Sequence, residues 1–127
     1  MDKIAFYGMS MGPVFGVFLT AVDQRIKTNI FYAGGIANLD RPEANIAYFL
    51  PRVKIPTLMI NGRYDSLFGL EAIMSMFYLL GTPEGDKKLV LFDSDHLAPR
   101  EDLVRETLAW LDQQFGQVIY IGDIQRL

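Results

Sequence analysis

The residues best able to do chemistry in this sequence are one serine, one aspartate and one histidine that lie far apart along the chain. Ser10 is at the centre of the segment GMSMG, Asp65 follows the run INGRY, and His96 is the single histidine. A serine hydroxyl is a weak nucleophile unless a base accepts its proton, and a carboxylate that orients the base completes such a set. These residue types predict nucleophilic chemistry at Ser10, provided that the fold brings them together.

The segment around Ser10 has the form Gly-x-Ser-x-Gly between an apolar run and a helix-like stretch. This arrangement is typical of a nucleophile elbow, a tight turn that is strained at the serine and exposes its hydroxyl at the carboxyl edge of a sheet. We expect Gly8 and Gly12 to be required, because a Cβ at either position would collide where strand and helix nearly touch. The motif is short enough to arise by chance, and an ordinary glycine-rich turn is the alternative, so its support has to come from the surrounding elements.

Four short apolar runs indicate the strands that would position these residues. They cover residues 4–7, 30–33, 57–60 and 89–92, and none of them alternates with polar residues. Such runs are typical of strands that are buried on both faces, as in a parallel sheet covered by helices. The intervening stretches of 22 to 28 residues are long enough for helical crossovers and too long for hairpins. We therefore predict an α/β fold with a parallel sheet of about four strands flanked by helices.

Helical periodicity predicts three helices. The first covers residues 11–23, and Gly16 within it indicates close packing of the helix on the sheet, since glycine costs about 1 kcal/mol relative to alanine in a helix interior. The second ends at Gly81, and the third begins after Pro99 and ends at Gly116. Apolar residues at helical spacing are Leu70, Ile73, Met74, Phe77 and Leu80 in the second helix, facing the core, and Val104, Leu108, Leu111 and Phe115 along one face of the third.

Two segments are irregular. Residues 34–56 contain a candidate short helix at 45–50 and would lie over or beside a pocket at the carboxyl ends of the strands. Residues 117–127 form a tail whose apolar run at 118–121 is an extra strand, a docking segment or a disordered end. Four apolar residues of the first segment are candidates for a substrate wall, although plain packing is favoured: Ile46, Tyr48, Phe49 and Leu50.

Composition excludes several classes of protein. The chain of 127 residues is 50% hydrophobic and 21% charged, with a net charge of −3, which describes one globular domain. The absence of cysteine excludes a thiol nucleophile and cysteine-based zinc sites, and it fits a reducing compartment. Without a dense run of Lys and Arg, nucleic acid is not expected as a partner. No apolar stretch approaches the roughly 20 residues that span a membrane, and residues 1–16 lack the features of a signal peptide. We expect a cytoplasmic protein with no metal or cofactor.

The order Ser10, Asp65, His96, with the three residues after the first, third and fourth apolar runs, resembles the C-terminal half of an α/β-hydrolase. The segments IPTLMINGRYD and FDSDHLAPREDLVRETLAWLDQQFG are similar to dienelactone-hydrolase-like and prolyl-oligopeptidase-type serine hydrolases. The resemblance implies a partial α/β-hydrolase domain over residues 1–116, followed by the tail 117–127.

This resemblance also implies roles for the residues. Ser10 would be the nucleophile, His96 the general base and then the general acid, and Asp65 the carboxylate that orients His96. The backbone N–H of Met11 would be one oxyanion donor. The implied activity is that of a serine hydrolase, an esterase or peptidase that cleaves a small-molecule ester or peptide bond through an acyl-enzyme.

Alternative roles stay open for these and neighbouring residues. Asp65 could instead form a turn or cap a helix, and His96 could be an ordinary loop residue. Asp93 and Asp95 are rival carboxylates, less suited because near neighbours along a loop rarely face the imidazole side on. Arg63 and Tyr64 are candidates for the pocket wall, with surface and core positions favoured.

The departure from the family lies before the elbow. A complete α/β-hydrolase has several strands there, and a loop among them supplies the second oxyanion N–H; here three residues precede the elbow strand. We expect that strand to be an open edge, covered by a missing N-terminal half of a longer protein or by another chain, such as a second copy in a homodimer. Without the second donor, turnover would be roughly 10²- to 10³-fold lower.

Two other functions are compatible with the sequence. The chain could be a non-catalytic half-fold that serves as an interaction or dimerisation module. A phosphate-binding module built on the glycines of residues 8–16 ranks last, because this segment lacks both the Gly-x-x-x-x-Gly-Lys-Ser/Thr and the Gly-x-Gly-x-x-Gly arrangements.

Overall fold

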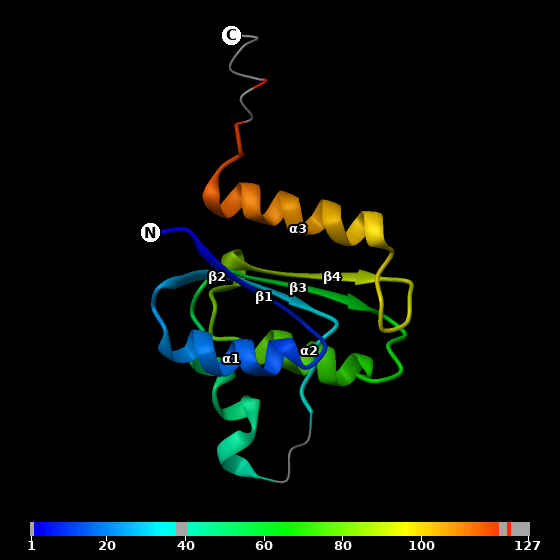
Figure 1. Cartoon of the computed structure of the whole chain (residues 1–127). Helices are drawn as coiled ribbons and strands as arrows, with labels where there is room; N and C mark the ends of the chain where they lie inside the picture. The colour runs from blue at the N-terminus through cyan, green and yellow to red at the C-terminus, as the bar shows by residue number, and fades with distance from the viewer. Residues whose placement is uncertain (1, 38–40, 120–121, 123–127) are drawn as a thin grey trace.

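Four parallel strands form one sheet in the computed structural model, which describes residues 2–37, 41–119 and 122. The strands are β1 (Ile4–Met9), β2 (Ile26–Tyr32), β3 (Thr57–Gly62) and β4 (Lys87–Phe92), and their spatial order is the order of the sequence (Figure 1). All three neighbouring pairs are parallel, so the four carboxyl ends lie at one edge of the sheet. The predicted α/β fold with four parallel strands is confirmed.

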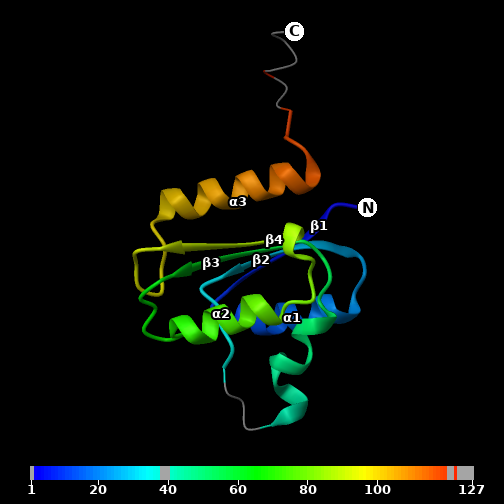
Figure 2. The same ribbon diagram turned by 180° about the vertical axis from the view of Figure 1, so that it is seen from behind.

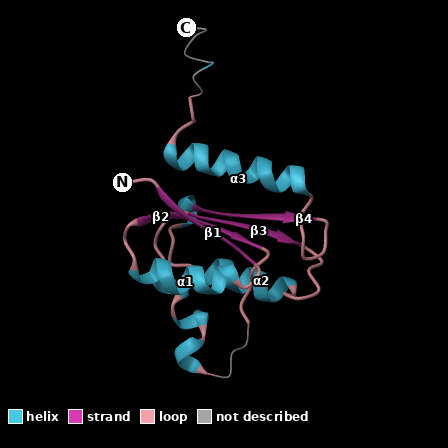
Figure 3. Ribbon diagram, in the orientation of Figure 1, coloured by secondary structure: helices cyan, strands magenta, loops and turns pink. Residues whose placement is uncertain are grey.

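Three α-helices cover the two faces of this sheet. Helices α1 (Gly12–Val22) and α2 (Leu70–Leu79) lie on one face, and α3 (Arg100–Phe115) lies on the other (Figures 1 and 2). Between β2 and β3 the chain makes three short 3₁₀ turns, Pro42–Ala44, Ile46–Tyr48 and Leu50–Arg52, and a fourth, Glu84–Asp86, precedes β4 (Figure 3). The short helix predicted at residues 45–50 is therefore two separate 3₁₀ turns.

The core has two layers, one on each side of the sheet. The layer under α1 and α2 contains Phe31 and Met59, and the layer under α3 contains Ile30 and Leu58. Neighbouring residues of β2 and β3 thus enter opposite layers, as expected for strands buried on both faces. The prediction of burial on both faces is wrong for β1 and β4, which lie at the two edges of the described sheet. The residues of β1 are mostly half-buried or exposed, and residues 89–92 of β4 are half-buried.

The third helix is rotated relative to the apolar stripe that the sequence suggested. Trp110 is buried, and its indole N–H donates a hydrogen bond to Thr28 Oγ1 at 2.8 Å. Leu103 and Leu111 pack beside it, whereas Val104 and Leu108 are 47% and 56% exposed. The apolar stripe predicted for residues 70–80 is partly correct. Ile73 in α2 and Leu80 directly after it are buried, as is the unpredicted Met76, whereas Leu70 is exposed.

The irregular segment between β2 and β3 contributes to the core. Ile46 and Leu50 are fully buried in the layer under α1 and α2, and the ring of Phe49 packs edge-on against Phe18. Tyr48 is exposed. These positions bear out the packing interpretation for Ile46, Phe49 and Leu50.

The tail begins where α3 ends, at Gly116, whose φ of 82° suits glycine. Val118 and Ile119 are exposed, and residues 120, 121 and 123–127 lie outside the described residues. The choice between a strand, a docking segment and a disordered end for residues 118–121 stays open, and the division at residue 116 stays a prediction. No helix in the described parts of the chain is long and apolar enough to cross a membrane.

Replacing Gly16 by alanine is expected to destabilise the fold. A Cβ at this position would lie 2.7 Å from the ring of Phe31, which is fully buried and cannot move aside, and it would also overlap the ring of Phe6. Overpacking of this kind costs roughly 1–3 kcal/mol, which outweighs the gain of about 1 kcal/mol in helix propensity. The measurement is the free energy of unfolding in urea.

The matched control for this substitution is Gly12→Ala in the same helix. A Cβ at Gly12 would have no neighbouring atom within 4 Å, so its unfolding free energy should stay the same or rise. If Gly16→Ala proves as stable as Gly12→Ala, the close approach of α1 to the sheet is not as described.

Candidate active site

Ser10, Asp65 and His96 come together at the carboxyl edge of the sheet. They follow β1, β3 and β4, which end at the same edge because the strands are parallel. His96 Nε2 lies 3.1 Å from Ser10 Oγ, and His96 Nδ1 lies 2.8 Å from Asp65 Oδ2. The structure thus brings the three predicted residues into one continuous chain of hydrogen-bonding contacts, while their roles stay predictions.

Ser10 occupies a strained turn between β1 and α1. Its φ of 59° lies in the left-handed region, which is uncommon for a residue with a side chain. The Ser10 N–H donates to the carbonyl oxygen of Tyr32 at 2.8 Å, which fixes the turn to the end of β2. Strain that is held in place by surrounding contacts is characteristic of functional sites.

The two glycines of the elbow differ in their steric role. A Cβ at Gly8 would lie 2.8 Å from the carbonyl carbon of Gly12, so Gly8 is required where strand and helix approach each other. A Cβ at Gly12 would meet no atom within 4 Å, so the predicted collision is wrong for Gly12. Gly8 approaches the backbone of Gly12, whereas the space that a side chain at Gly12 would occupy is empty.

Asp65 uses its two carboxylate oxygens for two purposes. The side chain is buried, and Oδ1 accepts hydrogen bonds from the N–H groups of Leu67 at 2.8 Å and Phe68 at 3.0 Å. Oδ2 faces His96. The turn-forming role and the contact with the histidine, which the sequence posed as alternatives, are therefore both present.

His96 is held in a defined orientation by its neighbours. The ring of Phe68 stacks on the imidazole with a centroid distance of 6.2 Å and an interplanar angle of 27°. For Nε2 to accept the proton of Ser10, the neutral ring must carry its proton on Nδ1, where it donates to Asp65. This tautomer is assigned from the hydrogen-bond network.

The remaining carboxylates near His96 do not contact its ring. Asp93 pairs with Arg63 at 3.1 Å, and both side chains are exposed. Asp95 Oδ1 accepts from the backbone N–H of His96 at 2.7 Å, so it binds the main chain. Arg63 lies on the surface, as favoured, whereas the core position favoured for Tyr64 is wrong because its side chain is exposed.

Two buried residues that the sequence did not indicate, Tyr32 and Asn61, join the loops around the site. Tyr32 is buried at the end of β2, and its hydroxyl accepts a hydrogen bond from Ala98 N–H at 2.8 Å, just after His96. Asn61, fully buried in β3, donates to the carbonyl oxygen of Gly34 at 2.8 Å. Both hydrogen bonds join segments that are far apart in the sequence, so no local sequence pattern predicts them.

The backbone N–H of Met11 is available to a ligand. Met11 precedes the first residue of α1, and its carbonyl oxygen accepts from Val14 N–H. Among the hydrogen bonds of residues 2–37, 41–119 and 122, none uses the Met11 N–H. An unpaired N–H at a helix N-terminus attracts negative charge, so Met11 is suited to the predicted oxyanion contact.

A cavity of about 470 Å³ opens beside the N-terminus of α2, lined by Ile36, Gly69, Glu71, Ala72 and Ser75. Ser10, Asp65 and His96 do not line this cavity. Its closest link to the site is Phe68, which precedes Gly69, stacks on His96 and packs against Gly35. Within the described residues, no group of three or more histidine or acidic side chains is placed to hold a metal ion.

The chain is similar to solved structures of esterases and related hydrolases. A cold-adapted esterase from an Arctic intertidal metagenomic library is 28% identical, with a TM-score of 0.75, over 85% of this chain and 47% of that one. An esterase from Pyrococcus furiosus is 18% identical, with a TM-score of 0.75, over 89% of this chain and 54% of that one. A candidate dienelactone hydrolase from Klebsiella pneumoniae is 15% identical, with a TM-score of 0.74, over 88% of this chain and 52% of that one. The latter two show likeness of fold alone.

The search of protein-family models found no match, and the search of curated proteins found none either.

The four parallel strands flanked by helices match the α/β-hydrolase fold, over about half the length of the structures compared. The neighbours are esterases and related hydrolases, and the 28% identical esterase is consistent with a relationship of this chain to the α/β-hydrolase superfamily.

Proposed function

We propose that the protein is a serine hydrolase that cleaves ester or peptide bonds through an acyl-enzyme. The observation that carries the proposal is the contact chain from Ser10 Oγ to His96 Nε2 and from His96 Nδ1 to Asp65 Oδ2. Nucleophile, base and orienting carboxylate at hydrogen-bonding distance are the arrangement that activates a serine hydroxyl. The prolyl-oligopeptidase-type resemblance leaves peptides as substrates, while the 28% identical esterase favours esters.

In the proposed reaction, Ser10 Oγ attacks the carbonyl carbon of the substrate while His96 Nε2 takes its proton. The carbonyl oxygen becomes an oxyanion, to which the Met11 N–H donates a hydrogen bond. His96 then gives the proton to the leaving alcohol or amine, the carbon–oxygen or carbon–nitrogen bond breaks, and an acyl group remains on Ser10. Water, activated by His96, attacks the acyl-enzyme and releases the acid.

Asp65 serves this sequence by holding one tautomer of His96. The positive charge that His96 acquires when it takes the serine proton lies beside a buried carboxylate, which stabilises it. No cofactor takes part in the proposal, and the expected cytoplasmic location stays a prediction from the sequence.

The experiment is a stopped-flow assay with p-nitrophenyl acetate, with an alanine p-nitroanilide as the amide substrate. An acyl-enzyme predicts a burst of p-nitrophenol in proportion to the protein concentration, followed by slower turnover. Ester cleavage without amide cleavage would define an esterase. Release of p-nitrophenol at the same rate with the His96→Ala variant would contradict the proposal.

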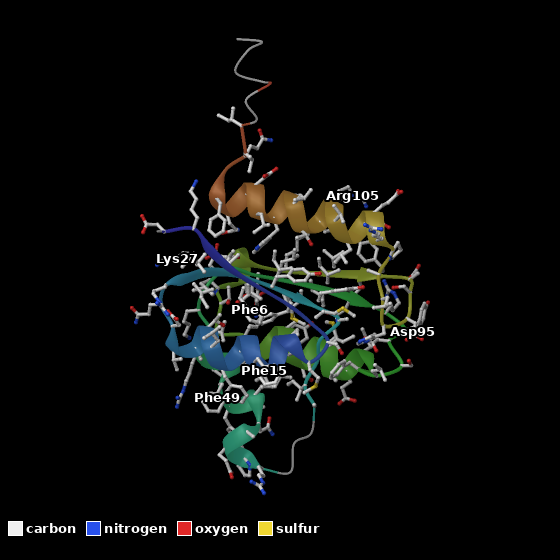
Figure 4. All side chains as sticks on the ribbon, viewed as in Figure 1. Phe6, Phe15, Lys27, Phe49, Asp95 and Arg105 are labelled. Carbon is white, nitrogen blue, oxygen red and sulfur yellow. The ribbon has the colours of Figure 1, made fainter. Side chains whose placement is uncertain are left out.

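A second candidate function is supported by the open edge of β1. This strand lies at the end of the described sheet, and Tyr7 and Met9 on it are about half exposed. On the neighbouring helix α1, Phe15 is labelled in Figure 4 and is 65% exposed. Leu19 and Val22 follow it at helical spacing and are also exposed. Unpaired strand edges and contiguous exposed apolar residues are typical of interaction surfaces. We propose as the alternative that the half-fold is a dimerisation module in which a second copy covers this edge.

The dimerisation alternative predicts that the purified chain has twice its 14.4 kDa mass and that Phe15→Glu reduces the mass to that of a monomer. A carboxylate cannot be buried without a partner, so the variant should weaken the contact while leaving the exposed position folded. The measurement is size-exclusion chromatography with light scattering. Tyr78→Glu on α2, where the side chain is also exposed, is the matched control and should remain dimeric.

A monomeric wild-type chain whose β1 amide protons are protected from hydrogen exchange would contradict the dimer. If these amide protons are protected only in a longer protein that contains this chain, a further segment of that protein covers β1.

A further inference from the structure

Asp65 and His96, the proposed acid and base of the site, lie on different loops. Asp65 belongs to the loop 63–69 between β3 and α2, and His96 belongs to the loop 93–99 between β4 and α3. Their contact of 2.8 Å therefore depends on how the two loops are held relative to each other. Misplacement of a reacting group by about 1 Å can cost roughly 10²-fold in rate, so contacts between these loops have consequences for chemistry.

The beginnings of the two loops are joined through their main chains. Arg63 N–H donates to the carbonyl oxygen of Phe92 at 2.8 Å, and Tyr64 N–H donates to that of Ser94 at 3.0 Å. Gly62 permits this approach, because a Cβ there would overlap the carbonyl oxygen of Asp95. Beyond Tyr64 the loops are joined by a side chain.

That side chain is Asp95, at the end of the sheet where the loops after β3 and β4 lie (Figure 4). Its Oδ1 accepts a hydrogen bond from Ser66 N–H at 2.8 Å and a second from His96 N–H at 2.7 Å. Ser66 directly follows Asp65. A single carboxylate oxygen thus ties the backbone next to the acid to the backbone of the base.

We infer that Asp95 is a positioning residue. Its carboxylate holds the loop 63–69 and the histidine loop 93–99 at the relative position in which Asp65 contacts His96. Asp95 does not contact the imidazole ring, Ser10 or the reacting atoms, so it acts through the backbones that it connects. The expected effect of Asp95 on kcat rests on the proposed function. Its expected effect on the tautomer of His96 rests on the structure alone.

The charge of Asp95 suits this role. Hydrogen bonds from Ser66 and from the His96 N–H hold the pKa of the Asp95 carboxyl below its usual value of 3.8, so the group is ionised near neutral pH. Hydrogen bonds from N–H groups to an ionised carboxylate are shorter and stronger than neutral ones. Asp95 is exposed, so shortening its side chain removes the two hydrogen bonds without opening a cavity in the core.

Asp93 provides a matched control two residues away. Asp93 is also an exposed carboxylate of the loop 93–99, but its partner is the side chain of Arg63. Both side chains of this ion pair are exposed. Exposed pairs of this kind contribute little to stability. Loss of Asp93 should therefore leave the contact between Asp65 and His96 unchanged.

The test compares Asp95→Ala, Asp95→Asn and Asp93→Ala by long-range ¹H–¹⁵N NMR. Because His96 is the single histidine, its ring nitrogens give one set of signals whose shifts report the tautomer directly. The wild type and Asp93→Ala should carry the proton on Nδ1, facing Asp65. In Asp95→Ala the signals should shift toward the Nε2–H form that imidazole prefers in water. Asp95→Asn keeps a side-chain oxygen as acceptor, so it should restore the wild-type signals.

Kinetics provide the second readout of the same three variants. With p-nitrophenyl acetate, kcat of Asp95→Ala should fall by roughly 10- to 100-fold with KM almost unchanged, since the loops shift the base relative to Ser10. Asp95→Asn should recover most of the loss. The unfolding midpoint of each variant is measured alongside, and a fall in stability without a change in tautomer or kcat would mean that Asp95 is only structural.

The inference is overturned if Asp95→Ala retains the Nδ1–H tautomer and the kcat of Asp93→Ala. Failure of the proposed function would give a different result, because the wild type would show the Nδ1–H tautomer but no ester turnover. In that case the comparison of tautomers between the wild type and Asp95→Ala would test the role of Asp95.

Discussion

Ser10→Ala is expected to abolish the burst of p-nitrophenol and to lower kcat by up to about six orders of magnitude, the loss found when the nucleophile of a serine hydrolase is removed. The substitution deletes the hydroxyl that lies 3.1 Å from His96 Nε2. No other described hydroxyl contacts the imidazole ring, so no residue could take over the attack. The measurement is pre-steady-state and steady-state hydrolysis of p-nitrophenyl acetate.

Folding must be shown to survive this substitution. Alanine can occupy the left-handed φ of 59° at about the same cost as serine, so the unfolding midpoint should change little. Ser75→Ala on α2 removes a hydroxyl that makes no hydrogen bond to His96 among the described residues, so it is the matched control and should retain the burst. Turnover in Ser10→Ala within tenfold of the wild type would mean that another group is the nucleophile.

Asp65→Asn is expected to lower kcat by roughly 10⁴-fold, an effect known for the triad aspartate of a serine protease. Asp65 Oδ1 accepts two backbone N–H groups, from Leu67 and Phe68, so the amide of an asparagine would place its oxygen there. Its NH₂ group would then face His96 Nδ1. Since that nitrogen would have to accept a hydrogen bond, the ring proton would move to Nε2, which could no longer take the proton of Ser10.

The two backbone hydrogen bonds survive in Asp65→Asn, so the protein should remain folded while activity falls. This separation of stability from activity is what distinguishes an orienting carboxylate from a turn-forming one. Asp93→Asn makes the same chemical change on an exposed carboxylate of the other loop and should be almost as active as the wild type. A loss of less than tenfold in Asp65→Asn would assign the orientation of His96 to another group.

The parallel sheet and the edge at which the residues of the candidate site meet could be predicted from the sequence because both depend on local patterns. Apolar runs separated by crossover-length stretches predict a parallel sheet, and a parallel sheet brings Ser10, Asp65 and His96 to one edge. The packing role of Gly16 was also predictable, since a helix-interior glycine needs a reason. The clash of a Cβ with Phe31 supplies it.

Other features depend on three-dimensional packing that periodicity does not encode. In α3, the face with Trp110 packs on the sheet, where Trp110 donates a hydrogen bond to Thr28, and Val104 and Leu108 of the predicted face stay exposed. Strand β2 begins four residues before its apolar run because Thr28 and Asn29 are buried with hydrogen-bond partners. The link between Asp95 and Ser66 arises between two loops 29 residues apart, where no sequence motif records it.

The chain spans about half the length of the esterase structures that it matches, so the activity of the whole protein is a proposal that requires a direct test. Half the length of a hydrolase does not by itself exclude a reactive serine, because the residues proposed as nucleophile, base and acid all lie within the described residues. Reactivity toward an inhibitor separates this question from the turnover of any one substrate.

The most direct measurement is therefore covalent labelling with a fluorophosphonate, followed by peptide mapping in a mass spectrometer. The serine oxygen attacks phosphorus, fluoride leaves, and a stable phosphonyl ester remains on the nucleophile. We predict one adduct per chain, located at Ser10, lost in Ser10→Ala and strongly slowed in Asp65→Asn. Absence of an adduct from folded wild-type protein, in this chain and in any longer parent protein, or an adduct at a serine other than Ser10, would contradict the account.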